Sequence, residues 1–172
     1  MPELIAPTVD LRDSWMESTS EWRGAHQDGA GLWEADDLST VEGFAAWTQR
    51  LREQSAAEEV TPDRVPASYW WIVEGGTYLG AISLRHALND KLLEAGGHIG
   101  YGVRPSARGR GVATWALGAA LDRARERGID RVLITCDDGN IASARTIERN
   151  GGVLEDVRET WLGLARRYWI TL

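Results

Sequence analysis

A basic, glycine-rich stretch near the middle of the chain has the residue types that bind phosphate. It runs Val103-Arg104-Pro105-Ser106-Ala107-Arg108-Gly109-Arg110-Gly111-Val112-Ala113, between a strand-like and a helix-like segment. The first N–H groups of a helix have no acceptor within the helix, and the helix dipole adds about half a positive charge there. Glycines let a ligand approach such a turn closely. The stretch therefore predicts a site for phosphate or pyrophosphate oxygens.

The turn differs from two well-known nucleotide-binding turns. It lacks the Gly-Lys-Ser/Thr of a Walker A loop and the G-x-G-x-x-G spacing of a dinucleotide site. A protein that uses the turn for ATP is therefore disfavoured, and another pyrophosphate is expected. The alternative to a binding site is an ordinary exposed connection between a strand and a helix.

The residues Arg108-x-x-Gly111-x-Ala113 resemble the Arg/Gln-x-x-Gly-x-Gly/Ala motif of the GNAT superfamily of acetyl-CoA-dependent N-acetyltransferases. Segment 98–103 and the segment from Asn140 to Gly151 are similar to the family's fourth strand and its Asn-initiated helix. The resemblance covers residues 70–172, and the front of the chain matches only in the order of its elements. It implies a GNAT-like acyl-CoA acyltransferase fold with the acceptor site on the front helices.

The resemblance also implies which residues bind acetyl-CoA. Backbone groups at Val103 and at 109–114 would hold its pantetheine and pyrophosphate. The residues singled out here are Val103, Arg104, Arg108, Gly109, Arg110, Gly111, Val112, Ala113 and Asn140. Arg104, Arg108 and Arg110 are each either a phosphate contact or a solvated charge. Asn140 either only caps its helix or also contacts the pantetheine arm.

Acetyl transfer to an amine requires that a proton leave the amine and that the departing thiolate be protonated. His98 is the candidate base, because many family members carry a Glu at this place, and a structural histidine is the alternative. Many members place a proton-donating Tyr where this chain has Ile147. The candidates to replace that Tyr are Tyr101, Ser143, Cys136 or a water, although Cys136 also fits an inert buried thiol.

These residues indicate an N-acetyltransferase that moves the acetyl group of acetyl-CoA to a primary amine of a small molecule by direct attack. One alternative is a catalytically degenerate acyl-CoA-binding or regulatory domain. Another is an acetyltransferase for protein N-termini or lysines. Among one cysteine and three histidines no metal-ligand spacing occurs, so no metal is expected.

The charge balance points to a cationic partner. Asp and Glu number 26 against 19 Lys and Arg, a net charge of −7, which disfavours nucleic acid and anionic membranes. Acids in the front segment could attract a cationic or ring-bearing amine, or could simply be solvated: Glu17, Glu21, Asp28, Glu34 and Asp36. Six of the nine tryptophans lie in the first 71 residues. At least four of these six are expected in the core, with one or two facing a cleft.

A length of 172 residues favours one domain, 1–172. Residues 1–68 are expected to form the acceptor side and 69–172 the acetyl-CoA-binding core. The N-terminus has acids and prolines where a secretion signal is basic and apolar, so a cytoplasmic location is expected. The oligomeric state stays open, with a homodimer among the options.

The pattern of apolar and turn-forming residues predicts an α/β (α+β) fold with a mixed, mostly antiparallel central sheet flanked by helices. Strands are expected at 4–11, 69–73, 77–84, 98–103, 131–136, 153–157 and 167–172. Helices are expected at 13–23, from Val41 to Gln54, at 113–127 and from Asn140 to Gly151. Ser14 or Asp13 is the expected cap of the first helix.

Overall fold

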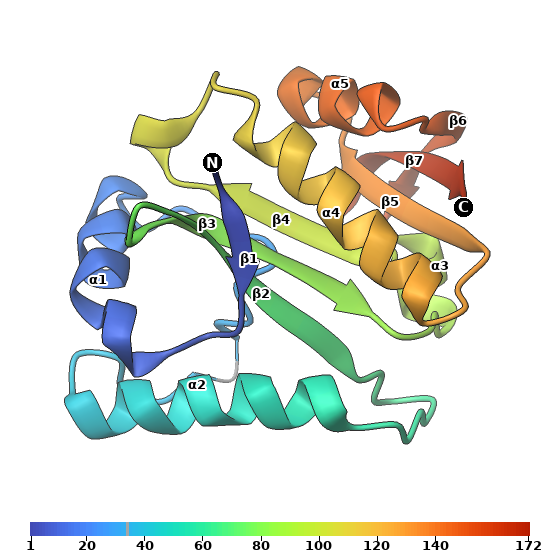
Figure 1. Cartoon of the computed structure of the whole chain (residues 1–172). Coiled ribbons are helices and arrows are strands. Elements are labelled where there is room, and N and C mark those ends of the chain that lie inside the picture. Colours follow the sequence, from blue (N-terminus) through green and yellow to red (C-terminus); the bar gives the residue numbers. More distant parts are fainter. Residues whose placement is uncertain (34) are drawn as a thin grey trace.

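The computed structural model describes residues 1–33 and 35–172, and it has an α+β fold with two antiparallel sheets (Figure 1). The first sheet has the order β1 (Glu3–Ile5), β2 (Ala67–Glu74), β3 (Thr77–Arg85), β4 (Ile99–Val103). The second has the order β5 (Arg131–Asp137), β7 (Gly163–Thr171), β6 (Val153–Thr160). The helices are α1 (Arg12–Glu21), α2 (Val41–Ala56), α3 (Asp90–Glu94), α4 (Val112–Glu126) and α5 (Ile141–Arg149), with short 3₁₀ turns at Val9–Leu11 and Pro105–Ala107.

The predicted fold class is confirmed, with one refinement: the central sheet is divided between β4 and β5. The two sheets stay joined beside the first residue of β4. There the N–H of His98 donates to the Leu133 carbonyl at 2.8 Å. The Leu133 N–H donates in return to the ring nitrogen Nδ1 of His98 at 2.9 Å. Beyond this point no backbone hydrogen bond among the described residues joins β4 to β5, and this interruption of the ladder is called the gap below.

Helices cover both faces of the first sheet (Figure 1). Trp71 and Ile72, which are neighbours in β2 and so point to opposite faces, belong to two different apolar cores. Ile72 lies in the core that α4 and α5 share with both sheets. Trp71 lies in the core under α1 and α2, where rings pack at centroid separations of 5.2–6.1 Å.

Three of the six front tryptophans are fully buried, one fewer than expected. Trp15, Trp47 and Trp71 are 1–2% exposed. Trp70 is half-buried at the edge of one core, Trp22 is half-buried against Gly102 and Arg108, and Trp33 is 81% exposed. The core under α1 and α2 already contains six buried aromatic side chains: Trp15, Phe44, Trp47, Tyr69, Trp71 and Tyr78.

The start of the chain differs from prediction. Only Glu3–Ile5 is a strand, because Pro7 lacks an N–H and the Thr8 side chain then caps a 3₁₀ turn. Neither Ser14 nor Asp13 caps α1, which has no side-chain cap. The Ser14 hydroxyl instead accepts from the N–H of Tyr78 at 2.8 Å, which fixes α1 to β3.

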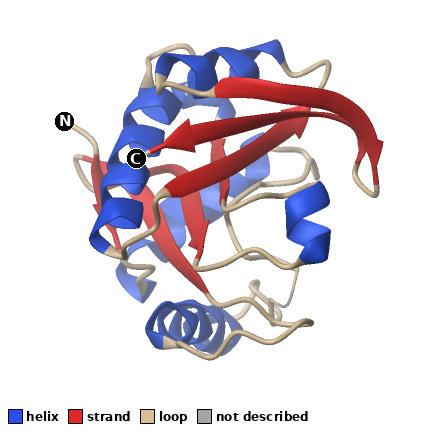
Figure 2. Ribbon diagram, turned by 90° about the vertical axis from the view of Figure 1, so that its right-hand side faces the viewer, coloured by secondary structure: helices blue, strands red, loops and turns tan. Residues whose placement is uncertain are grey.

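Side chains close in sequence set the ends of the later helices. The Thr40 hydroxyl caps α2 and accepts from the Gly43 N–H at 3.0 Å. The final strands are longer than predicted and form a hairpin that curves away beside α3 (Figure 2). Helix α3, capped by Asn89, lies between the strands expected at 77–84 and 98–103, where the sequence analysis placed no element. No helix among the described residues is long and apolar enough to cross a membrane.

Candidate active site

The glycine-rich turn has the geometry that an anion site requires. Gly109 and Gly111 adopt φ of +76° and +78°, and α4 starts directly after Gly111 without a side-chain cap. A Cβ atom placed on either glycine would meet no atom within 4 Å, so open space lies in front of the turn. The leading N–H groups of α4 face that space without partners from the helix itself. The turn therefore fits the pyrophosphate of a coenzyme.

Two of the three arginines lie at the rim of this turn. The Arg108 Nε donates to the Val103 carbonyl at 2.9 Å, and its guanidinium lies 4.8 Å from the centre of a Trp22 ring. The Arg110 side chain is 53% exposed and pairs with Glu74 at 2.7 Å. Both side chains remain candidates for a phosphate contact, because neither is buried.

The third arginine corrects the sequence-based assignment. Arg104 is only 4% exposed, and its guanidinium donates to Glu21 through Nε at 3.0 Å and also through Nη2. Its remaining nitrogen, Nη1, donates to the Tyr78 carbonyl at 3.1 Å. All three nitrogens of the Arg104 guanidinium are therefore engaged with α1 and β3, and its burial leaves it poorly placed to contact a phosphate.

Glu21 is the anchor of this arrangement. Besides Arg104, its carboxylate accepts from the N–H and the hydroxyl of Ser106, each at 2.9 Å. The hydrogen bonds from Arg104 are the main reason that the pKa of Glu21 falls to about 2. The sequence indicated Glu21 only as one acid of the acceptor side. In the structure, the Glu21 carboxylate links α1 to the residues at the start of the glycine-rich turn.

The predicted proton donors meet at the gap between β4 and β5. The hydroxyls of Tyr101 on β4 and Ser143 on α5 are 2.7 Å apart. Burial raises the pKa of Tyr101 to about 12 and also raises the pKa of Cys136, near the end of β5. Both groups are therefore protonated at neutral pH. Ile147 is fully buried in the core, so its position offers nothing to the gap.

His98 lies in a structural position. Its ring is 6% exposed, and Nδ1 is occupied by the Leu133 N–H. Burial lowers the pKa of His98 to about 4, so the ring is neutral at pH 7 with its proton on Nε2. These contacts favour the structural alternative over the role of base.

Asp28 is an acid that the sequence did not single out as a base. Its neighbour Gly29 packs so tightly on β4 that a Cβ there would lie 2.3 Å from the Gly100 oxygen, which places Asp28 beside the strand. The Asp28 side chain is 69% exposed and contacts His26 at 3.0 Å. The surrounding protein partly removes the Asp28 carboxylate from water, and this desolvation raises its pKa. An exposed carboxylate with a raised pKa can accept a proton from an amine.

The remaining predicted residues frame the same space. The Asn140 carbonyl oxygen accepts from the Ser143 N–H at 3.1 Å, which confirms the cap and leaves its NH₂ group exposed. Val103 and Val112 are buried, so only their backbone can meet a ligand, and Ala113 is half-buried. Glu34 lies outside the described residues. Within 1–33 and 35–172, no group of three or more His, Cys, Asp or Glu could hold a metal ion.

Comparison with known proteins places this geometry in context. A sequence profile described as Acetyltransferase (GNAT) domain matches residues 21–153, more than half of the chain. No protein of curated function matches the sequence.

Several solved structures share the fold at low identity. RimL, a ribosomal L7/L12 alpha-N-protein acetyltransferase solved with coenzyme A in a disulfide with one of its cysteines, is 20% identical, with a TM-score of 0.68 over 99% of this chain and 94% of that one. Ribosomal-protein-S5-alanine acetyltransferase from Vibrio fischeri is 17% identical, with a TM-score of 0.69 over 99% and 91%. The microcin C7 self-immunity acetyltransferase MccE, solved with acetyl-CoA and AMP, is 16% identical, with a TM-score of 0.67 over 99% and 92%.

Glu21→Gln should destabilise the protein by about 2–4 kcal/mol, because it removes the charge that compensates the buried Arg104 guanidinium. The pKa of Glu21 lies below its unfolded value, so its stabilising effect is complete above about pH 4.5 and disappears as pH falls toward 2. Urea denaturation at several pH values should find this acid-sensitive component in the wild type and not in the variant. Glu17→Gln is the matched control, since Glu17 lies 3.4 Å from Arg104 but is 71% exposed, and it should change stability by less than about 1 kcal/mol.

His98→Ala should lower the free energy of unfolding by about 1–3 kcal/mol at pH 7, because the buried Leu133 N–H loses its acceptor. With a folded pKa near 4, His98 makes the wild type less stable as pH falls from about 6.5, so the difference between the proteins should shrink toward pH 4. The midpoint of the pH–rate profile for coenzyme A thiol release should not move. A stable variant with a displaced midpoint would instead make His98 the base.

Proposed function

The chain belongs to the GNAT family of acetyl-CoA-dependent acetyltransferases, and on that premise we propose that its acceptor is the α-amino group at the N-terminus of a protein or peptide. The likeness to RimL and to the Vibrio fischeri enzyme, whose names state ribosomal-protein acceptors, supports this choice. It replaces the small-molecule amine favoured by the sequence as the leading candidate.

The observation that carries the proposal is the scarcity of a strong base at the gap. Among the described residues there, His98 has a pKa near 4 and an occupied Nδ1, and Tyr101 has a pKa near 12. A lysine-like amine, with a pKa near 10.4, is neutral in only about one molecule in 2,500 at pH 7. An α-amino group, with a pKa of about 7.7–8.0, is neutral in roughly one in ten. An acceptor that supplies its own neutral amine suits this site best.

The transfer then proceeds with the residues present. The lone pair of the amine nitrogen attacks the acetyl carbon, the C–N bond forms, and the C–S bond breaks with its electron pair left on sulfur. Ser143 donates a proton to that sulfur and recovers one from Tyr101, its partner at 2.7 Å, and Tyr101 is reprotonated from water. Asp28, whose raised pKa makes it a better acceptor of protons than an ordinary aspartate, takes the proton that leaves the amine.

The coenzyme is assigned to the turn and the gap together. The N–H groups at 109–114 bind its pyrophosphate, assisted by Arg108 and Arg110, and Asn140 offers its free NH₂ group to the pantetheine arm. The thiol end lies near Cys136. The disulfide between coenzyme A and a cysteine of RimL supports a cysteine within reach of the coenzyme thiol in this fold.

The acceptor approaches from residues 1–68, which include Asp28, while 69–172 bind the coenzyme. The proposal keeps the cytoplasmic location expected from the sequence. It requires neither a metal ion nor a second copy of the chain.

A small-molecule amine is the second candidate. The likeness to MccE, a self-immunity enzyme against a microcin, supports it. The exposed ring of Trp33, in the same loop as Asp28 and Asp36, offers a surface for a cationic or ring-bearing amine.

Acceptor preference should separate these candidates. We expect thiol release with peptides that have a free N-terminus and none with the same peptides N-acetylated, even when they contain lysine. The rate should rise from pH 6 to pH 8 as the α-amine loses its proton. Polyamines, aminoglycosides and amino-nucleosides serve as the comparison panel. A preference for that panel would favour the small-molecule reading, and no thiol release with any amine would favour a non-catalytic acyl-CoA-binding domain.

Gly111→Ala should weaken coenzyme A binding at least about tenfold, because the new methyl group occupies the space in front of the turn and the residue must keep φ near +78°. Gly128→Ala is the matched control. Gly128 has φ of +77°, also faces open space and lies at the other end of α4, so both variants should lose similar stability, about 1 kcal/mol. Calorimetry should find normal coenzyme affinity only in Gly128→Ala. Equal affinities would remove the turn from the coenzyme site.

A further inference from the structure

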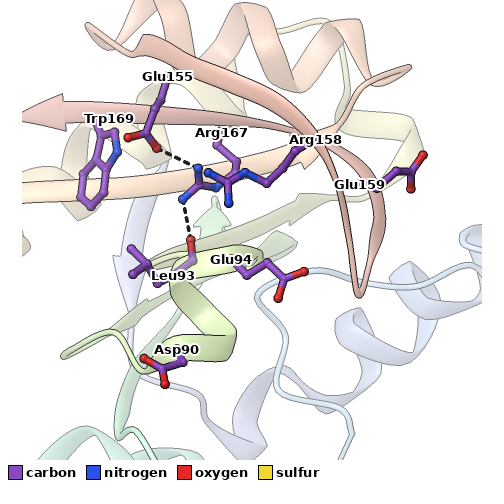
Figure 3. A pocket seen from close by; sticks show the side chains of 8 residues that line it. All are labelled: Asp90, Leu93, Glu94, Glu155, Arg158, Glu159, Arg167 and Trp169. Carbon is purple, nitrogen blue, oxygen red and sulfur yellow. Dashed lines mark hydrogen bonds and ion pairs between the residues drawn. The ribbon is translucent and has the colours of Figure 1, made fainter.

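A pocket of about 450 Å³ lies between α3 and the β6–β7 hairpin, on residues that the proposed reaction does not use (Figure 3). Its walls combine two apolar side chains with six charged ones. They are Asp90, Leu93, Glu94, Glu155, Arg158, Glu159, Arg167 and Trp169.

Two buried donors in this pocket have no acceptor among the described residues. Arg167 is 3% exposed, and its terminal nitrogens are used, with Nη1 at 2.8 Å from Glu155 and Nη2 at 2.8 Å from the Leu93 carbonyl. Its Nε and the ring nitrogen Nε1 of Trp169 are both buried and unpartnered. Figure 3 shows the Trp169 nitrogen on the side of the ring that faces Arg167. A buried donor without a partner costs free energy, so an acceptor atom is expected between these groups.

The charge around the donors is negative. Arg167 is neutralised by Glu155 and by Asp156, and Arg158 also pairs with Asp156 at 2.6 Å. The described structure gives Asp90 and Glu159 no ion-pair partner, and Glu94 accepts only the N–H of Trp161 at 3.2 Å. The pocket lining, with four acids and two arginines, therefore carries a net negative charge beside the two unpartnered donors, and Arg158 also interacts with Glu94.

We propose that this pocket binds a lysine- or arginine-bearing stretch of polypeptide. A backbone carbonyl of that stretch accepts from Arg167 Nε and Trp169 Nε1, and the basic side chain lies among Asp90, Glu94 and Glu159. A phosphate or carboxylate would satisfy the donors but would be repelled by the acids. An apolar ligand would leave the donors unpaired.

The inference rests on the proposed function in one respect, which is that the bound stretch belongs to the acceptor itself. Arg167 pairs with Thr135, the neighbour of Cys136, and β6 lies two strand spacings, about 10 Å, from β5. An extended peptide advances about 3.3 Å per residue. Residues three to five of an acceptor whose N-terminus reaches the gap are therefore at the right separation for the pocket.

The test measures binding without the reaction. The probe is a fluorescent, N-acetylated peptide with lysines at positions three to five, and fluorescence anisotropy is followed with the full chain and coenzyme A. The N-terminus of this peptide is blocked and coenzyme A carries no acetyl group, so binding is measured without acetyl transfer. A peptide with glutamates in place of the lysines should bind at least tenfold more weakly.

Variants then identify the pocket. Trp169→Phe keeps an aromatic ring under Arg131 but removes the donor, and should weaken binding about 3- to 10-fold. The pair Asp90→Asn with Glu159→Gln should weaken it by a similar factor and flatten its salt dependence. Glu58→Gln with Asp63→Asn changes the net charge equally at exposed loop positions and should have no effect.

Each outcome decides between the two proposals. Equal binding by wild type and all variants would mean attraction by the overall negative charge and would overturn the pocket. Failure of the blocked lysine peptide to bind, while free N-termini are acetylated, would overturn the pocket and leave the proposed function intact. Binding that depends on the pocket, without acetylation of any peptide, would support the pocket and overturn the N-terminal acceptor.

Discussion

The exchange of hydrogen bonds between His98 and Leu133 is the constraint on which the site depends. One of its two bonds is made by a side chain, so the backbone ladder stops there and the strands can diverge. A buried, neutral imidazole suits this position because it accepts from an N–H without bringing a charge into the core. Tyr101 and Cys136 lie on β4 and β5, the two strands that no longer pair beyond this exchange. Had the ladder continued, backbone atoms would occupy the space that the reaction requires.

A second link, from Glu21 to Arg104 and Ser106, joins the two sides of the molecule. It connects α1 to Arg104 and Ser106 at the start of the glycine-rich turn. Helix α1 lies on the face of the sheet where the acceptor is expected. The side-chain hydroxyl of Ser14 adds a bond from the same helix to β3. A displacement of α1 would therefore move the turn, so the two substrates are expected to influence each other's binding through this helix.

What the sequence predicted, and what it missed, follows from the range of the interactions. The turn at 103–113, the Asn140 cap and the helix expected at 113–127 depend on neighbouring residues, so local rules were sufficient. Arg104 looked like a phosphate ligand because its partner, Glu21, is 83 residues away and nothing in the sequence joins them. The role of His98 depends on Leu133, 35 residues later. The pocket beside α3 combines three separate segments and left no local pattern.

The open edge of the second sheet has a consequence for how the protein behaves at high concentration. β6 is the last strand in its sheet, and it exposes Val153, Leu154 and Val157 by 43–70%. Such an edge can recruit a strand from another molecule and begin aggregation. Charged side chains at Glu155, Asp156, Arg158 and Glu159 interrupt the apolar ones along this strand and so act as gatekeepers. Substitutions that remove those charges would lower the colloidal stability of the protein.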